Sequence, residues 1–70
     1  MKIFKVKAGS YRTETIAGFF GYIKKVDSQW HAKIYTKDFE LNRFAGVWNT
    51  RKEAIEEIET ILARKMAGIS

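Results

Sequence analysis

The segment Trp48-Asn49-Thr50-Arg51-Lys52-Glu53-Ala54 constrains the fold more than any other part of the sequence, because it marks where a helix begins. The Thr50 hydroxyl can accept a hydrogen bond from the backbone N–H of Glu53, and the Glu53 side chain can reach back to the N–H of Thr50, which makes a capping box. We therefore predict a helix over about residues 51–66, ended by Gly68 in the left-handed conformation. Its apolar stripe consists of Ile55, Ile58, Ile61, Leu62 and Met66.

Four segments before this helix alternate bulky and polar side chains, as β-strands do. They cover about residues 2–7, 16–26, 30–35 and 39–48. The polar stretch 11–15 between the first two is compatible with a loop or with a frayed strand. We expect an α+β fold, in which a three- or four-stranded antiparallel sheet packs against one C-terminal helix.

Three local features interrupt or end these strands. Gly18 and Gly21 lie inside the second segment and indicate a bulge or a close approach to the backbone. Asp27-Ser28 supplies a turn, although it lacks the glycine that is typical of a primed turn. The alternation slips by one residue near Asn42-Arg43, which indicates either a β-bulge or a second turn.

Length and composition limit the organisation of the chain. The 70 residues fit a single domain, residues 1–70, with a small core. No cysteine is present, which excludes disulfides and thiolate metal sites and fits a cytoplasmic location. No apolar run has the length of a signal peptide or approaches the about 18 residues of a membrane span.

The net charge of +5 is concentrated in the first part of the chain, because residues 51–70 carry equal numbers of acidic and basic side chains. A basic strand region favours an anionic partner, such as nucleic acid or an acidic protein. The alternative is that the charge only keeps a small protein soluble. We expect no membrane partner.

The sequence offers little for catalysis. His31 is the only histidine, and it has no cysteine or second histidine with which to form a metal site. The helix glutamates are expected on its solvated side or, for Glu53, in the cap. No phosphate loop, nucleophile elbow or dinucleotide fingerprint is present. We therefore expect a protein that is not an enzyme and that uses no metal and no cofactor.

A basic and aromatic sheet face is the stronger candidate site. Trp30, Ala32 and Ile34 alternate with His31, Lys33 and Tyr35, so one set can pack on the helix while the other lies on the open side. Tyr22 or Trp48 could stack beside the cations, although lysines on amphipathic strands also serve only to block aggregation. The candidate nucleic-acid-binding residues are Lys5, Lys7, Lys24, Lys33, Tyr35 and Arg43.

A protein-binding surface is the alternative. Phe19 and Phe20 are adjacent in a strand, so one of them points away from the helix. Together with Ile23, they could form an exposed apolar patch that binds another protein or a second copy of this chain. The patch could equally be covered by a further strand or by the stretch 11–15.

The segment Trp30-x-Ala32-x-Ile34, followed by Phe44-x-Gly46-x-Trp48-x-Thr50-x-x-Glu53-Ala54, resembles the sheet-plus-helix domains at the amino end of mobile-element integrases. The resemblance covers about residues 22–62. Those domains lay a three-stranded sheet into the DNA major groove, which implies Lys24, Lys33, Tyr35 and Arg43 as groove-facing residues. The chain also looks like a small phage or mobile-element accessory protein, a class that includes inhibitors of host enzymes.

Overall fold

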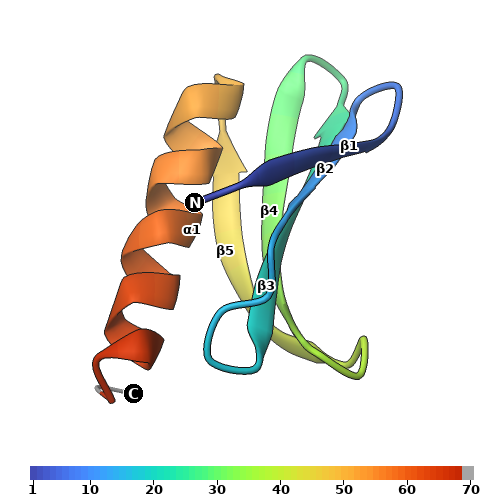
Figure 1. Cartoon of the computed structure of the whole chain (residues 1–70). Coiled ribbons are helices and arrows are strands. Elements are labelled where there is room, and N and C mark those ends of the chain that lie inside the picture. Colours follow the sequence, from blue (N-terminus) through green and yellow to red (C-terminus); the bar gives the residue numbers. More distant parts are fainter. Residues whose placement is uncertain (69–70) are drawn as a thin grey trace.

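The computed structural model describes residues 1–68 and contains five antiparallel strands followed by one helix (Figure 1). Each strand pairs with its neighbours in the sequence, so the sheet is a meander with the order β1-β2-β3-β4-β5. The fold is α+β with one C-terminal helix, as expected, but the sheet has more strands than the three or four predicted. The elements are β1 (Ile3–Lys7), β2 (Ser10–Thr13), β3 (Phe19–Val26), β4 (Gln29–Thr36), β5 (Leu41–Trp48) and α1 (Arg51–Met66).

The additional strand is β2, which the sequence pattern leaves open as a loop or a frayed strand. Its end residues, Ser10 and Thr13, are polar and yet only 1% and 2% exposed. The Thr13 hydroxyl accepts a hydrogen bond from the Gly21 N–H at 2.9 Å and donates one to the Glu14 carbonyl at 2.9 Å. These hydrogen bonds allow the polar Thr13 side chain to be buried. Because the buried end residues of β2 are polar, an alternation of apolar and polar residues does not reveal this strand.

Strand β3 begins at Phe19, three residues later than predicted. Before it, Ile16 and Phe19 exchange two backbone hydrogen bonds of 2.7 and 3.0 Å across Ala17 and Gly18. Both central residues have positive φ, 54° and 83°. Gly18 therefore belongs to a tight turn and not to a bulge. The Asp27-Ser28 turn also has positive φ at both positions, 49° and 71°, although it contains no glycine.

Strand β5 contains two irregularities. Tyr35 pairs with Leu41 and Ile34 pairs with Arg43, so the phase slip near Asn42 is a bulge within the strand. A second irregularity lies at Gly46, whose φ is 98°. Together they place one set of side chains on the side of α1 and the other set on the opposite side. Arg43, Ala45 and Trp48 form the first set, and Leu41, Phe44 and Val47 form the second.

Helix α1 packs on β3, β4 and β5 and forms the core with them (Figure 1). Ala32 and Ile34 are fully buried under it, which confirms the predicted orientation of β4. The stripe on the helix is shifted slightly from the prediction, because Met66 is exposed and Ala54 is buried. The buried core consists of Ile23, Ala32, Ile34, Ala45, Ala54, Ile58, Ile61 and Leu62.

The helix has the predicted bounds and the predicted cap residue. The Glu53 N–H donates to the Thr50 hydroxyl at 3.2 Å. The return contact differs from the prediction, because the Glu53 carboxylate accepts from the Thr50 hydroxyl at 3.1 Å and not from its N–H. At the other end, Gly68 has a φ of 77° and its N–H donates to the Lys65 carbonyl at 3.1 Å, as expected for the terminator.

Within residues 1–68, no helix has both the length and the apolar character needed to cross a membrane.

Gly21 is expected to be intolerant of any side chain, because a Cβ at this position would overlap Ile58 of α1. Gly21→Ala should lower the free energy of unfolding by about 1–3 kcal/mol, since overpacking forces the helix away from the sheet. In an Ile58→Ala background the same change should cost much less. Denaturant unfolding of the four proteins measures this, and an equal cost in both backgrounds would place α1 elsewhere.

Thr50→Ala should lower the free energy of unfolding by about 1 kcal/mol, because it removes the acceptor of the Glu53 N–H. Glu53→Ala should then cost less in the Thr50→Ala background than in the native one, since the two side chains contact each other. Thermal or denaturant unfolding checks both changes. Additive effects would show that the two residues cap the helix independently.

Candidate functional site

Helix α1 covers one side of the sheet and leaves the other side uncovered (Figure 1). Residues that pair directly across antiparallel strands project to the same side, so the register assigns every side chain. Ala32 and Ile34 point to α1, and the residues between them point away. We call the uncovered side the open face. It contains Phe4, Val6, Lys7, Arg12, Phe20, Tyr22, Lys24, His31, Lys33, Tyr35, Leu41, Phe44 and Val47.

One row of side chains crosses the whole open face and touches all five strands. Phe4 pairs with Arg12, Arg12 with Tyr22, Tyr22 with Lys33, and Lys33 with Phe44. We call these five residues the central row. Aromatic and cationic side chains alternate along it without interruption, and at a strand spacing of ~4.8 Å it extends over about 19 Å. Its two ends are open to solvent, since Phe4 is 48% and Phe44 is 52% exposed.

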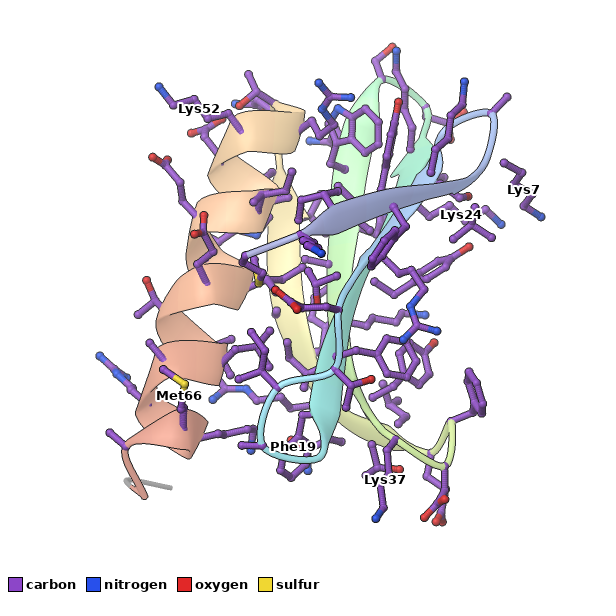
Figure 2. All side chains as sticks on the ribbon, in the orientation of Figure 1. Lys7, Phe19, Lys24, Lys37, Lys52 and Met66 are labelled. Atoms are coloured by element: carbon purple, nitrogen blue, oxygen red, sulfur yellow. The ribbon has the colours of Figure 1, made fainter. Side chains whose placement is uncertain are left out.

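A second row lies toward the turns that join β1 to β2 and β3 to β4. Lys7 and Lys24 both pair with the small, buried Ser10, so the two lysines flank it. Figure 2 shows both lysines projecting away from α1 on the same side of the molecule. The row continues from Lys24 to His31 and then to Val47. This part of the open face is therefore its most basic end.

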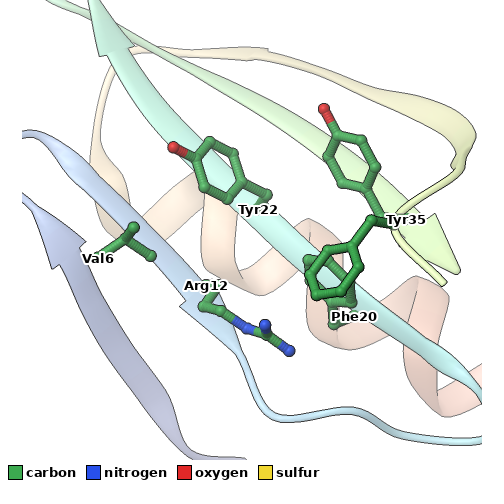
Figure 3. Close-up of a pocket in the computed structure, with 6 residues that line it drawn as sticks. Val6, Arg12, Phe20, Tyr22 and Tyr35 are labelled. Atoms are coloured by element: carbon green, nitrogen blue, oxygen red, sulfur yellow. The ribbon is translucent and has the colours of Figure 1, made fainter. Parts of the chain in front are cut away.

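An aromatic hollow of about 270 Å3 lies beside the central row (Figure 3). The Phe20 ring is stacked on Tyr35, with centroids 5.6 Å apart and an angle of 19°. Tyr22 stands edge-on to Tyr35 at 6.2 Å, and Phe39 stands edge-on to Phe20 at 5.6 Å. The Arg12 guanidinium lies 4.0 Å from the Phe20 ring centroid. The hollow is lined by Val6, Arg12, Phe20, Tyr22, Tyr35 and Phe39.

Phe39 is held in an unfavourable backbone conformation at the rim of this hollow. Its φ is 65° and its side chain is 70% exposed. A left-handed bulky residue costs about 1–3 kcal/mol, which the surrounding structure must offset. The Thr36 hydroxyl accepts hydrogen bonds from the N–H groups of Asp38 and Glu40 at 3.3 and 3.2 Å. The Phe39 N–H donates to the Thr36 carbonyl at 2.9 Å, so this turn fixes the ring over the hollow.

The charges on the sheet are all of one sign. None of the five strands, which together lie within the described residues 3–48, contains Asp or Glu. Acidic residues lie in the turns and in α1, and two of them, Asp38 and Glu40, flank Phe39. The central row therefore lies among positive charges, whereas Phe39 is preceded and followed in the chain by acidic residues. The strand cations are Lys5, Lys7, Arg12, Lys24, Lys25, Lys33 and Arg43.

The structure brings together four of the six residues that the sequence suggests for nucleic-acid binding. Lys7, Lys24, Lys33 and Tyr35 lie on the open face. The other two were expected there and lie on the side of α1.

Lys5 pairs with Tyr11, which packs against the core, so its side chain lies on the helix side of the sheet. Arg43 pairs with the buried Ile34, because the bulge at Asn42 reverses the phase of β5. Trp48 also lies on this side, where its Nε1 donates to the Ala45 carbonyl at 2.9 Å. These residues do not contribute to the open face.

Six residues of the open face are not among the residues that the sequence suggests: Phe4, Val6, Arg12, Leu41, Phe44 and Val47. Phe39, which lines the hollow, is not among the suggested site residues either. Arg12 falls in the stretch that was not assigned to a strand, and Phe44 falls after the bulge. Phe4 lies on β1, which is outside the group of strands on which α1 packs. The αL conformation of Phe39 has no signal in the sequence, because asparagine and glycine are the usual residues at such positions.

The residues suggested for a protein-binding patch do not form one. Phe20 does point away from α1, as expected for one of the adjacent pair, but it is only 4% exposed beneath its aromatic neighbours. Ile23 is part of the buried core. Phe19 packs partly against that core, and the Lys65 ammonium lies 4.0 Å from its ring centroid. The exposed large apolar side chains of the open face and of the turn before β5 are other residues, namely Phe4, Val6, Phe39, Leu41, Phe44 and Val47.

His31 lies on the open face between Lys24 and Val47 in the register. In the part of the chain that the structure describes, no three His, Cys, Asp or Glu side chains are grouped so that they could hold a metal ion.

Comparison of the chain with models of known protein families, with curated proteins and with solved structures finds no match.

Proposed function

We propose that the open face is a non-catalytic nucleic-acid-binding surface. The observation that carries the proposal is the central row, in which Phe4, Tyr22 and Phe44 alternate with Arg12 and Lys33 across all five strands. A nucleic-acid strand presents flat bases and anionic phosphates at regular intervals. A surface that alternates aromatic and cationic groups matches both components at once.

Each component has a defined energetic role. Stacking of a base on an aromatic side chain contributes about 1–3 kcal/mol and tolerates any sequence. Cations release the counterions that are condensed on phosphates, which supplies affinity that falls with salt. The absence of Asp and Glu from all five strands, within the described residues, leaves the strand cations free of acidic partners in the sheet. The basic end formed by Lys7 and Lys24 extends the path of a bound backbone beyond the central row.

A purely structural role explains this face less well. Lysines that alternate with apolar residues protect the edges of many sheets. Here, however, Phe4 and Phe44 lie on the two edge strands and are about half exposed, so they contribute little to the core. Half-exposed aromatic rings at both ends of a row that also carries Arg12 and Lys33 fit contact with a ligand or partner better than a structural role.

A protein partner is the second candidate, favoured by the exposed aliphatic residues Val6, Leu41 and Val47. Aliphatic side chains do not stack on bases as aromatic rings do. A homodimer through two open faces would bring Arg12 and Lys33 near the same cations of the second copy, and like charges at an interface oppose association. An acidic protein, such as a target of an accessory or inhibitor protein, is the partner class that avoids this repulsion.

Salt-dependent binding of labelled oligonucleotides tests the nucleic-acid proposal. If Arg12, Lys24 and Lys33 each neutralise one phosphate, log affinity should fall with log salt at a slope of about −2.7 on duplex DNA and about −2.1 on a single strand. Lys33→Glu should weaken binding to every sequence alike and flatten the slope by about 0.7–0.9.

Arg43→Glu is the matched control, because it makes the same charge change on the neighbouring strand but on the side of α1. It should reduce affinity much less than Lys33→Glu. Equal effects of the two variants would indicate that net charge, and not the open face, determines binding. If neither duplex nor single strand binds at about 50 mM salt, the nucleic-acid proposal fails. An acidic protein would then be the partner to seek by affinity capture.

A further inference from the structure

The aromatic hollow has features that binding of a regular duplex would not use. Its exposed rim residue, Phe39, is a bulky side chain in a left-handed turn that three hydrogen bonds to Thr36 maintain. Glycine or asparagine would form this turn without strain. Residues held in strained conformations cluster at ligand-binding positions, so the ring itself is the feature that needs an explanation.

We infer that the hollow receives one unpaired nucleobase, so that the open face binds single-stranded nucleic acid in preference to a duplex. This inference rests on the proposed nucleic-acid-binding function and names its substrate class.

The shape of the hollow suits a flat aromatic ligand. Phe20 and Tyr35 are nearly parallel, and the Arg12 guanidinium lies over the Phe20 ring. Tyr22 stands edge-on to Tyr35, and Phe39 stands edge-on to Phe20. Since Phe20 is buried and Phe39 is 70% exposed, Phe39 offers the ring on which a nucleobase would stack. The volume of about 270 Å3 lies near the lower end of small-ligand sites, ~300 Å3, so a single base is on the scale of a group that the hollow can receive. Figure 3 shows that Arg12 reaches toward the hollow from β2, with Tyr22 and Tyr35 on the far side. Guanidinium groups stack on bases as aromatic rings do.

The charges distinguish a base from a phosphate in this position. Asp38 and Glu40 are the chain neighbours of Phe39, so the negative charge of this turn disfavours a phosphate close to it. Carboxylates accept hydrogen bonds from the exocyclic amino groups of bases, which are neutral donors. A nucleic-acid strand that places one base in the hollow would therefore direct its sugar-phosphate backbone away from this turn, toward Lys33 and the basic end at Lys24.

Base pairing sets the preference for single strands. In a duplex each base is stacked and paired, so it can enter the hollow only if it is flipped out, whereas an unpaired base is already accessible. Sequence-tolerant proteins commonly bind single strands through aromatic side chains in a basic groove. The resemblance to integrase domains implies instead that the sheet binds in the major groove of a DNA duplex. The resemblance therefore predicts a preference for duplex DNA, whereas the nucleobase site predicts a preference for single strands.

Fluorescence anisotropy with a labelled oligonucleotide of about 12 nucleotides, alone and annealed to its complement, tests the inference. The native protein should bind the single strand more tightly than the duplex. Phe39→Gly should reduce single-strand affinity about 5- to 150-fold, the equivalent of one lost base stack at ~1–3 kcal/mol, and should change duplex affinity little. Phe39→Tyr should retain single-strand affinity, because it keeps the ring.

Ala17→Gly is the matched control, since Ala17 is also exposed and left-handed, with a φ of 54°, but lies in the turn before β3. It should leave both affinities unchanged. Phe39→Gly should remain folded, because glycine adopts a φ of 65° without strain. Phe39→Asn provides a second ring-free variant that tolerates the same conformation, and urea unfolding checks both.

The outcomes separate the two proposals. Equal affinity of the native protein for single strand and duplex, with no loss in Phe39→Gly or Phe39→Asn, would overturn the nucleobase site. If Lys33→Glu still weakened binding, the proposed function would stand. Absence of binding to either nucleic acid would remove both proposals. A loss in Ala17→Gly as large as in Phe39→Gly would assign the effect to turn geometry and would also overturn the nucleobase site.

Discussion

The structure depends on the contact between Ile58 of α1 and the backbone of Gly21 in β3, which leaves no space for a side chain at position 21. This contact lets the single helix of the described chain lie close on the central strands and bury Ala32 and Ile34 completely. One helix covers only one side of a sheet, so the other side remains in solvent. Burial therefore does not dictate which residues are present on the open face, and the proposed site lies there.

The arrangement on the open face follows from strand register. Antiparallel pairing aligns residues from distant parts of the chain, and in this way the central row takes one residue from each strand between Phe4 and Phe44. The two irregularities in β5 are essential for this alignment, because they turn Phe44 and Val47 outward and keep Ala45 in the core. The Thr36 turn then adds Phe39 to the same surface. The proposed nucleic-acid surface, with a site for one base, rests on the central row and on the strained Phe39 ring together.

The helix and the orientation of β4 were predictable from sequence, because the Thr50 cap and the Trp30-Ala32-Ile34 alternation are local signals. Strand β2 was not, because its buried end residues are polar and hydrogen-bonded. Lys5 and Arg43 were assigned to the open face on the assumption that apolar residues of every strand point to the helix and that β5 keeps one phase. β1 lies beyond the strands that α1 covers, and the bulge at Asn42 changes the phase, so both assumptions fail. The pairing partners of Arg12 and Phe44 depend on register, which sequence alone does not give.

Methyl resonances offer the most direct test of whether the open face is the binding surface, because methyl groups lie on both sides of the sheet. Val6, Leu41 and Val47 carry methyls on the open face, whereas Ile34, Ile58 and Leu62 carry them in the core. During titration of the methyl-labelled protein with a single-stranded oligonucleotide, we predict shifts of the Val6, Leu41 and Val47 signals in a salt-dependent manner, with the core signals nearly unchanged. Shifts confined to methyls of α1, or no shifts at low salt, would contradict the account.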